Sequence, residues 1–213
     1  MELHIPKLIY LISKKPSLTA AEFAARWRAH GDLATRNPRW RHVALYSQCD
    51  VVDDVRHDGV GVVWYKSFAA RAEGLAETTS QQIMEADERE IFSSLTSEVS
   101  FISEEPADFQ HPDARAKVFR FVSKETEFGD SRDVGLMGDS IASSIRWVWN
   151  TVIDKEPALR GPRLWAGVEE WSFLTIDEAL EARDVLVRSG VERDGAQVMA
   201  AVVNWLYPKT FAS

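Results

Sequence analysis

The first half of the chain alternates strand-like and helix-like hydrophobic patterns. Residues 7–13 are rich in β-branched and aromatic side chains and run into Lys-Lys-Pro-Ser, which predicts a strand and a turn. Thr19 and Glu22 have capping-box spacing, and the apolar positions after them follow a helical period that ends before Asn37. Further elements are predicted as strand 41–50, strand 58–66, helix 67–95 with a break near 78–80, and strand 99–102. This β-α-β-β-α-β order is that of a ferredoxin-like unit.

The same pattern starts again after residues 106–115, which contain two prolines and are predicted to be a linker. The second half is predicted to contain strands 117–123, 144–153, 165–173 and 198–207, a short or irregular helix within 128–140, and a helix capped by Thr175. The simplest interpretation is a tandem repeat, with a first unit at 1–105 and a second, degenerate unit at 116–213.

Several predicted strands are apolar on both faces. In strand 58–66, Val60, Val62 and Trp64 point to one side, while Val63 and Tyr65 point to the other. Exposing such a face to water costs about 25 cal/mol per Å², so a second layer must cover it. We therefore predict an α+β fold, in which two ferredoxin-like repeats pack their antiparallel sheets into an α/β barrel with a small cavity between the sheets.

Composition and charge narrow the choice of partners and compartment. The 213 residues carry 25 basic and 33 acidic side chains, a formal net charge of -8, and they contain no long basic run. We therefore expect no binding to nucleic acid or to a membrane surface. The single cysteine, Cys49, allows no internal disulfide, and the chain shows no signal-peptide pattern, so we expect a cytoplasmic protein.

Three side chains are the candidate catalytic residues. His30 lies on the apolar stripe of the first helix, where a neutral imidazole could act as acid or base, or could bond the carbonyls of the last helical turn. His42 belongs to a comparatively polar row on strand 41–50, which suits either a cavity wall or a solvated edge. Tyr10 could stabilise an oxyanion, or could be a core tyrosine with a satisfied hydroxyl.

The candidate substrate-binding residues are polar or aromatic side chains on the predicted strands. Glu169 is interpreted either as a pocket acid or as a residue at a solvated edge. No His/Cys spacing supports a metal site, no glycine-rich loop suits a nucleotide, and no nucleophile motif is present, so we expect neither a metal nor a cofactor. The predicted substrate-binding set is Tyr46, Gln48, Trp64, Tyr65, Trp147 and Glu169.

Several segments of the first half carry a family resemblance: KLIYL at 7–11, Trp27 followed by HGDL at 30–33, DGV and WYKS within 58–67, and DEREIF at 87–92. In this order they resemble the EthD family of dimeric α/β-barrel proteins. Asp32 stands where the family usually has proline. The resemblance implies a pocket for small cyclic or polyketide-like molecules. Related barrels include cofactor-free monooxygenases, isomerases, cyclases and dehydratases, as well as haem-binding branches.

The leading hypothesis is a cofactor-independent enzyme that acts on a small hydrophobic, aromatic or polyketide-like compound. His30 would transfer protons in a dehydration, cyclisation or isomerisation, or would prepare the compound for oxidation by O₂, with His42 and Tyr10 orienting it. One alternative is a non-catalytic protein that binds or delivers such a compound. Another is a structural module whose cavity is packed shut. The sequence leaves a homodimer open.

Overall fold

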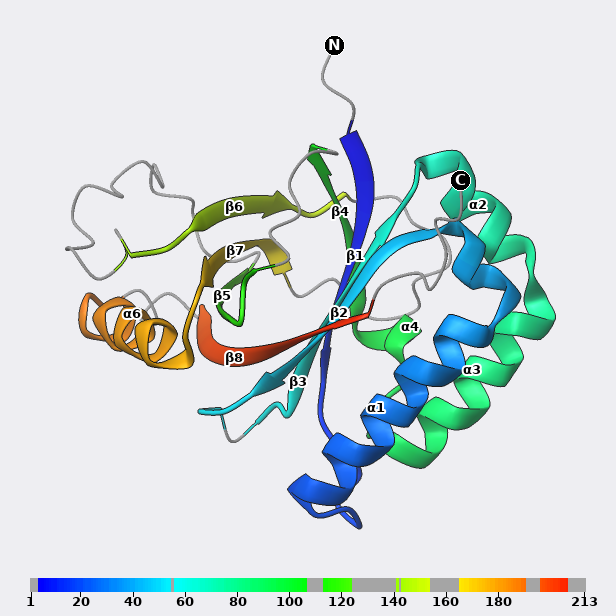
Figure 1. Cartoon of the computed structure of the whole chain (residues 1–213), viewed down its shortest axis with the longest axis horizontal. Helices are drawn as coiled ribbons and strands as arrows, with labels where there is room; N and C mark the ends of the chain where they lie inside the picture. The colour runs from blue at the N-terminus through cyan, green and yellow to red at the C-terminus, as the bar shows by residue number, and fades with distance from the viewer. Residues whose placement is uncertain are drawn as a thin grey trace.

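A computed structural model of the protein describes residues 4–54, 56–106, 113–123, 141, 143–153, 165–190 and 196–206. It has a mixed α+β architecture (Figure 1). The first half contains β1 (His4–Ile12), α1 (Ala20–Arg36), the 3-10 helix η1 (Pro38–His42), β2 (Val43–Val51), β3 (Gly59–Tyr65), α2 (Phe68–Ala76), α3 (Thr78–Ile91), α4 (Thr96–Val99) and β4 (Ser100–Pro106). The second half contains β5 (Ala116–Ser123), β6 (Arg146–Thr151), β7 (Trp165–Phe173), α6 (Ile176–Arg188) and β8 (Gln197–Leu206).

The eight strands in the described ranges belong to one antiparallel sheet, in the order β4-β1-β3-β2-β8-β5-β7-β6. Strands β2 and β8 join the halves, with Val51 opposite Ala201 in their ladder. The edge strands approach each other where Ile153 donates its backbone N–H to the Ile102 carbonyl at 2.7 Å. The sheet is thus nearly closed into a barrel, and the predicted α/β-barrel fold is confirmed.

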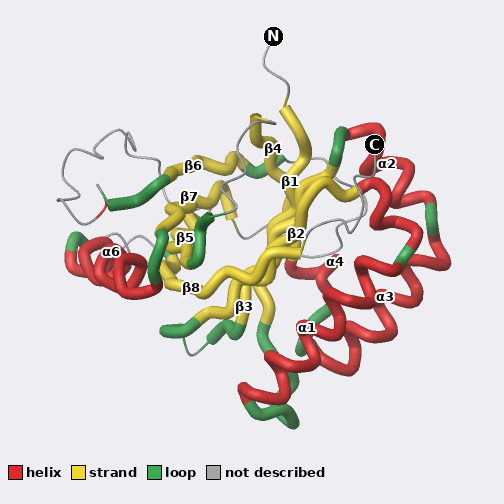
Figure 2. Tube along the Cα trace, in the orientation of Figure 1, coloured by secondary structure: helices red, strands yellow, loops and turns green. Residues whose placement is uncertain are grey.

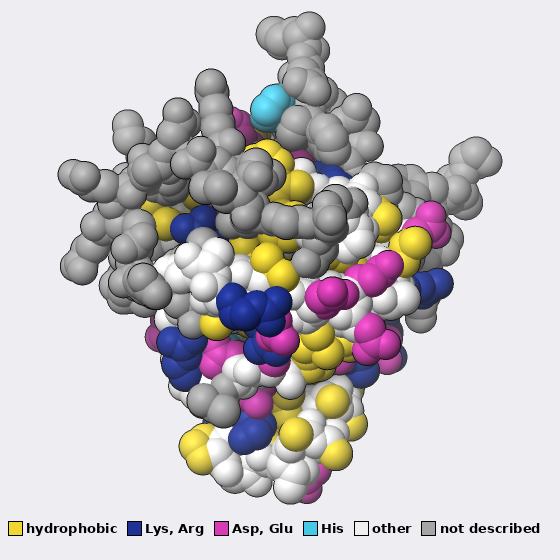
Figure 3. Space-filling model, turned by 90° about the vertical axis from the view of Figure 1, so that its left-hand side faces the viewer, with side chains coloured by type: hydrophobic (Ala, Val, Ile, Leu, Met, Phe, Trp, Pro, Cys, Tyr) yellow, Lys and Arg dark blue, Asp and Glu magenta, His cyan; other side chains and the backbone are white. Residues whose placement is uncertain are grey.

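The helices cover the outside of this barrel. Helices α1, α2 and α3 lie against the first half of the sheet, and α6 lies against the second half (Figure 2). The predicted helix within 128–140 falls outside the described residues. In the part of the chain that is described, no helix is long and apolar enough to cross a membrane. On the face shown in Figure 3, basic and acidic side chains are interspersed.

The predicted starts of α1, α2 and α6 are confirmed. Thr19 and Thr175 form reciprocal capping boxes with Glu22 and Glu178, and the Ser67 side chain accepts a hydrogen bond from the Ala70 backbone. These bonds satisfy orphan N–H groups of the first turn, and they need only neighbours in sequence.

Several strand boundaries differ from the prediction, including those of β2 and β4. The prediction that His42 lies on the second strand is wrong, because 38–42 forms η1, which is capped by the Asn37 side chain and has proline in its first turn. Strand β4 continues to Pro106, since its whole length pairs with β1. The predicted linker is described only at 106 and 113–115, and the division into two repeats stays a prediction.

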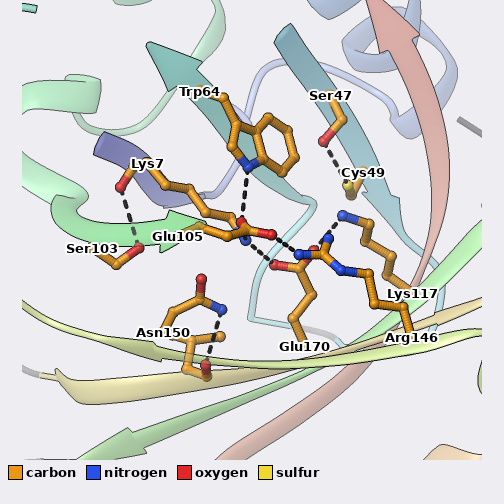
Figure 4. Close-up of polar contacts among 11 residues, drawn as sticks. Lys7, Ser47, Cys49, Trp64, Ser103, Glu105, Lys117, Arg146, Asn150 and Glu170 are labelled. Atoms are coloured by element: carbon orange, nitrogen blue, oxygen red, sulfur yellow. Dashed lines mark hydrogen bonds and ion pairs between the residues drawn. The ribbon is translucent and has the colours of Figure 1, made fainter. Parts of the chain in front are cut away.

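The barrel interior combines an apolar cluster with buried charges. Val60, Val62 and Trp64 belong to the interior cluster, as their alternation predicts. Five charged side chains meet between the strands in Figure 4, and each is at most 8% exposed: Lys7, Lys117 and Arg146 with Glu105 and Glu170.

The two buried carboxylates hold the three cations together. Lys7 Nζ lies 2.6 Å from Glu170 Oε2 and 2.8 Å from Glu105 Oε2. Lys117 contacts Glu170, and Arg146 contacts Glu105. Burial lowers the pKa of Lys7 to about 8, although Glu170 opposes this shift. Burial alone would raise the pKa of Glu170, but Lys117, Lys7 and Arg146 hold it well below its usual range.

Candidate active site between the sheet and the helices

A cavity of about 140 Å³ lies between the outer face of β1, β2 and β3 and the helical layer. We expected the cavity between the two half-sheets, whereas this one lies on the opposite face of the sheet. The space between the half-sheets contains the buried charges and aromatic rings described above. The cavity is lined by Leu8, Tyr10, His30, Ala34, Asn37, Arg39, Trp40, Val43, Tyr46, Val63, Tyr65, Gln81, Met84, Glu88 and Thr96.

An imidazole and a carboxylate form a pair at this cavity. His30 is buried on α1, and its Nδ1 lies 2.7 Å from Oδ2 of Asp87 on α3. The Phe92 ring packs edge-on against the imidazole, with 5.4 Å between the ring centroids. A carboxylate that accepts the Nδ1 proton leaves Nε2 as the basic nitrogen, so the pair can act in general acid–base chemistry.

Two tyrosine hydroxyls meet at the floor of the cavity. Tyr10 Oη on β1 and Tyr46 Oη on β2 are 2.5 Å apart, and both side chains are buried. Gln48 Nε2 donates to Tyr46 Oη at 3.1 Å and to the Trp27 carbonyl at 2.7 Å. Burial raises the pKa of Tyr10 well above its ordinary value, and it also raises that of Tyr46. Both phenols therefore keep their protons at neutral pH and can donate to an oxyanion.

Gly61 makes room for Tyr10. These residues face each other on β3 and β1, and a Cβ atom built on Gly61 would lie 1.9 Å from Tyr10 Cζ. Only a residue without a side chain allows the phenol to lie flat against β3 and reach Tyr46.

We expect Gly61→Ala to lower the free energy of unfolding by about 1–3 kcal/mol, because the new methyl group must displace the Tyr10 ring. Urea unfolding measures the change. Gly74→Ala is the matched control: its Cβ would lie 3.5 Å from the nearest atom, and its position in α2 favours alanine by up to about 1 kcal/mol. Equal effects of the two substitutions would contradict this placement of Tyr10.

Sequence reasoning missed Glu88, which also lines the cavity. Its oxygens accept hydrogen bonds from the Thr96 backbone N–H at 2.9 Å and from the Thr96 hydroxyl at 2.8 Å. Burial raises the pKa of this carboxyl, while Thr96 and His30 oppose the shift. A carboxyl with a raised pKa beside His30 is a second group that can hold a proton. Its place on the inner face of α3 is the only sequence signal that could have identified it.

The structure brings some of the predicted site residues together and separates others. Tyr10, His30, Tyr46 and Tyr65 line the cavity, and Gln48 contacts Tyr46 from behind. The others lie elsewhere: His42 beside Glu77 at the end of η1, Trp64 in the barrel interior, Trp147 exposed on β6, and Glu169 buried in an ion pair with Arg120 at 2.5 Å. Glu169 is therefore neither at this cavity nor at a solvated edge.

Three features of the described residues bear on metal, haem and nucleophilic chemistry. Within the described ranges, no group of three His, Cys, Asp or Glu side chains could hold a metal ion. A haem does not fit, because about 140 Å³ is well below the roughly 300–1,000 Å³ of pockets for drug-sized ligands.

Cys49 lies away from this cavity, in the apolar cluster of the barrel interior. It is buried, and burial raises the pKa of its thiol to about 11, so it is a poor nucleophile.

Comparisons with known proteins support the fold. No family model matches this chain, and no curated protein matches it. An anthrone oxidase-like protein of known structure is similar, with a TM-score of 0.62 and 10% identity over 97% of this chain and 94% of that chain. A mutant chlorite dismutase from Candidatus Nitrospira defluvii has a TM-score of 0.53 and 5% identity, over 94% of this chain and 91% of that chain. Likeness at such low identity shows a shared α/β-barrel fold, and the EthD resemblance stays a prediction.

Proposed function

We propose that the protein is an enzyme that carries out acid–base chemistry on a small aromatic compound bound between the sheet and α1 and α3. One observation carries this proposal: His30, which pairs with Asp87, lines the same cavity as the Tyr10–Tyr46 pair. A base beside a pair of neutral hydroxyl donors can remove a proton and stabilise the oxyanion that results.

His30 performs the proton transfer. Its Nε2 takes a proton from a carbon next to a carbonyl group, or from a phenol, while Asp87 holds the ring orientation and stabilises the imidazolium. The imidazolium then returns the proton to another carbon, which gives an isomer, or to a hydroxyl group that leaves as water. In an oxidative variant, O₂ takes two electrons from the deprotonated compound; the compound loses two hydrogens in total, and the two electrons and two protons leave as hydrogen peroxide.

The tyrosine pair stabilises the negative oxygen of the intermediate. Because Gln48 donates to Tyr46 Oη, the Tyr46 hydroxyl can donate to Tyr10, which then donates its own proton to the bound oxyanion. Such a donor chain is polarised along its length, which strengthens the last hydrogen bond.

We also propose that the two halves of the chain are EthD-like repeats. The strands of the first half lie in the order β4-β1-β3-β2, and those of the second half lie in the order β8-β5-β7-β6. When the strands are numbered within each half, both orders read fourth, first, third, second.

The test is a screen of phenols, aromatic acids and lactones for binding, followed by assays of substrate loss and of O₂ uptake. For a compound that turns over, Tyr10→Phe is expected to lower kcat about 100-fold, because it removes one oxyanion donor. Substrate affinity should change much less, since the ring stays in place. Binding without turnover would instead indicate the non-catalytic binding protein, and unchanged kcat in Tyr10→Phe would exclude the tyrosine pair from the chemistry.

A further inference from the structure

The cavity has a second polar end, away from His30. Helices α1 and α3 run in opposite directions, because His30 pairs with Asp87 whereas Asn37 Nδ2 donates to the Ser80 carbonyl at 3.3 Å. The lining residues Asn37, Arg39, Trp40 and Gln81 therefore lie toward the end of α1 and the start of α3. Seven residues of helix separate His30 from Asn37, which corresponds to about 10 Å.

Arg39 supplies a positive charge at this second end. Its guanidinium donates to the neutral amide oxygen of Gln81. Among the described residues, no carboxylate lies within 4.0 Å of Arg39, whereas nearby Arg41 pairs with Glu77 at 2.6 Å. In a chain with a net charge of -8, an arginine that lines a cavity beside a neutral partner suits an anionic ligand.

Trp40 adds an unused hydrogen-bond donor beside it. The indole packs edge-on against Tyr46 with 6.3 Å between ring centroids, and within the described part of the chain its buried Nε1–H has no acceptor. A buried donor without a partner is unfavourable, and a ligand oxygen in the cavity would relieve it.

The size of the cavity limits the rest of the ligand. A cavity of about 150 Å³ in another protein accommodates benzene, so about 140 Å³ suits one aromatic ring rather than a fused three-ring system. An aromatic ring with polar substituents at opposite positions can reach both ends of the cavity, because each substituent forms a hydrogen bond of about 2.8 Å to the protein.

We propose that Arg39 and Trp40 form an anion subsite and that the substrate is a single-ring aromatic carboxylate. Its carboxylate binds Arg39 and Trp40 Nε1, and its opposite substituent lies at His30 and the tyrosine pair. This inference rests on the proposed function, because it assigns the substrate class of the same cavity.

The test compares 4-hydroxybenzoate with 4-methylphenol by calorimetric titration of the full chain. These probes share the ring and the hydroxyl group and differ in the carboxylate. We expect the wild-type protein to bind 4-hydroxybenzoate at least about ten-fold more tightly. Arg39→Gln should abolish this preference and leave the affinity for 4-methylphenol unchanged. Arg36→Gln, on an exposed arginine in the last turn of α1, changes the net charge equally and should keep the preference.

Each outcome has a distinct meaning. If the wild-type protein binds both probes equally, or if Arg39→Gln and Arg36→Gln weaken 4-hydroxybenzoate to the same extent, the anion subsite is wrong while the aromatic cavity stands. If neither probe nor any other ring compound binds, the proposed function fails together with the subsite. Binding of 4-methylphenol by Arg39→Gln with wild-type affinity shows that the variant is folded.

Discussion

Replacing Glu170 by glutamine is expected to lower the free energy of unfolding by about 3–5 kcal/mol. The carboxylate contacts both buried lysines, so its removal takes from Lys117 the buried carboxylate that it contacts and leaves Lys7 with Glu105 alone among the described carboxylates. Desolvated charges without a partner are among the most destabilising features of a protein interior. Urea unfolding at pH 7 measures the change. Glu104→Gln is the matched control, since it is exposed on β4 beside Glu105 and should stay within about 0.5 kcal/mol of the wild type.

The effect of Glu170 should depend on pH in a defined direction. Its pKa in the folded protein is held below the ordinary value of 4.5. A carboxyl with a depressed pKa stabilises the fold above pH 4.5, and this contribution is lost as the pH falls toward the folded-state pKa. The difference in unfolding free energy between the wild type and Glu170→Gln should therefore shrink between pH 5 and pH 3. A difference that grows in this range, or a Glu170→Gln protein as stable as Glu104→Gln, would show that the central ion pairs are not formed.

Replacing His30 by glutamine is expected to lower kcat by about 10²–10⁴-fold for any compound that turns over. Glutamine keeps a polar group near Asp87 but cannot take a proton at neutral pH. Because His30 packs against Phe92 in a buried position, the unfolding midpoint must be measured alongside the activity. His4→Gln, on an exposed imidazole at the start of β1, is the control and should keep full activity.

The Asp87→Asn variant distinguishes a catalytic role of the His30–Asp87 pair from a structural one. Its amide can still contact His30 Nδ1 but cannot stabilise the imidazolium, so kcat should fall while the affinity for the substrate stays the same. Full activity of the His30→Gln protein would show that the imidazole does not take part in the reaction. If substrate affinity and stability fall together in His30→Gln and Asp87→Asn, the His30–Asp87 pair has only a structural role.

Local sequence signals predicted most of the described strands and helices and the faces that they bury. Thr19, Ser67 and Thr175 cap helices through bonds to residues three positions away, so the information lies within one turn. Alternation predicted that Trp64 and Tyr65 face opposite sides of β3, because the period of a strand is two whatever its partner. His42 was misplaced because a capped 3-10 turn competes with a strand over 38–42.

The sequence alone determined the strand and helix order, the helix caps, the apolar faces that require a closed barrel, and the presence of Tyr10 and His30 on faces turned toward a core. Only the tertiary structure decided which groups meet. His30 and Asp87 are 57 positions apart, and Lys7 and Glu170 are 163 apart, so no local period relates them. A charged side chain in an apolar strand row can point to a solvated edge or to a buried partner. The choice depends on the desolvation of charges that become neighbours only when β1, β5, β6 and β7 close into one barrel.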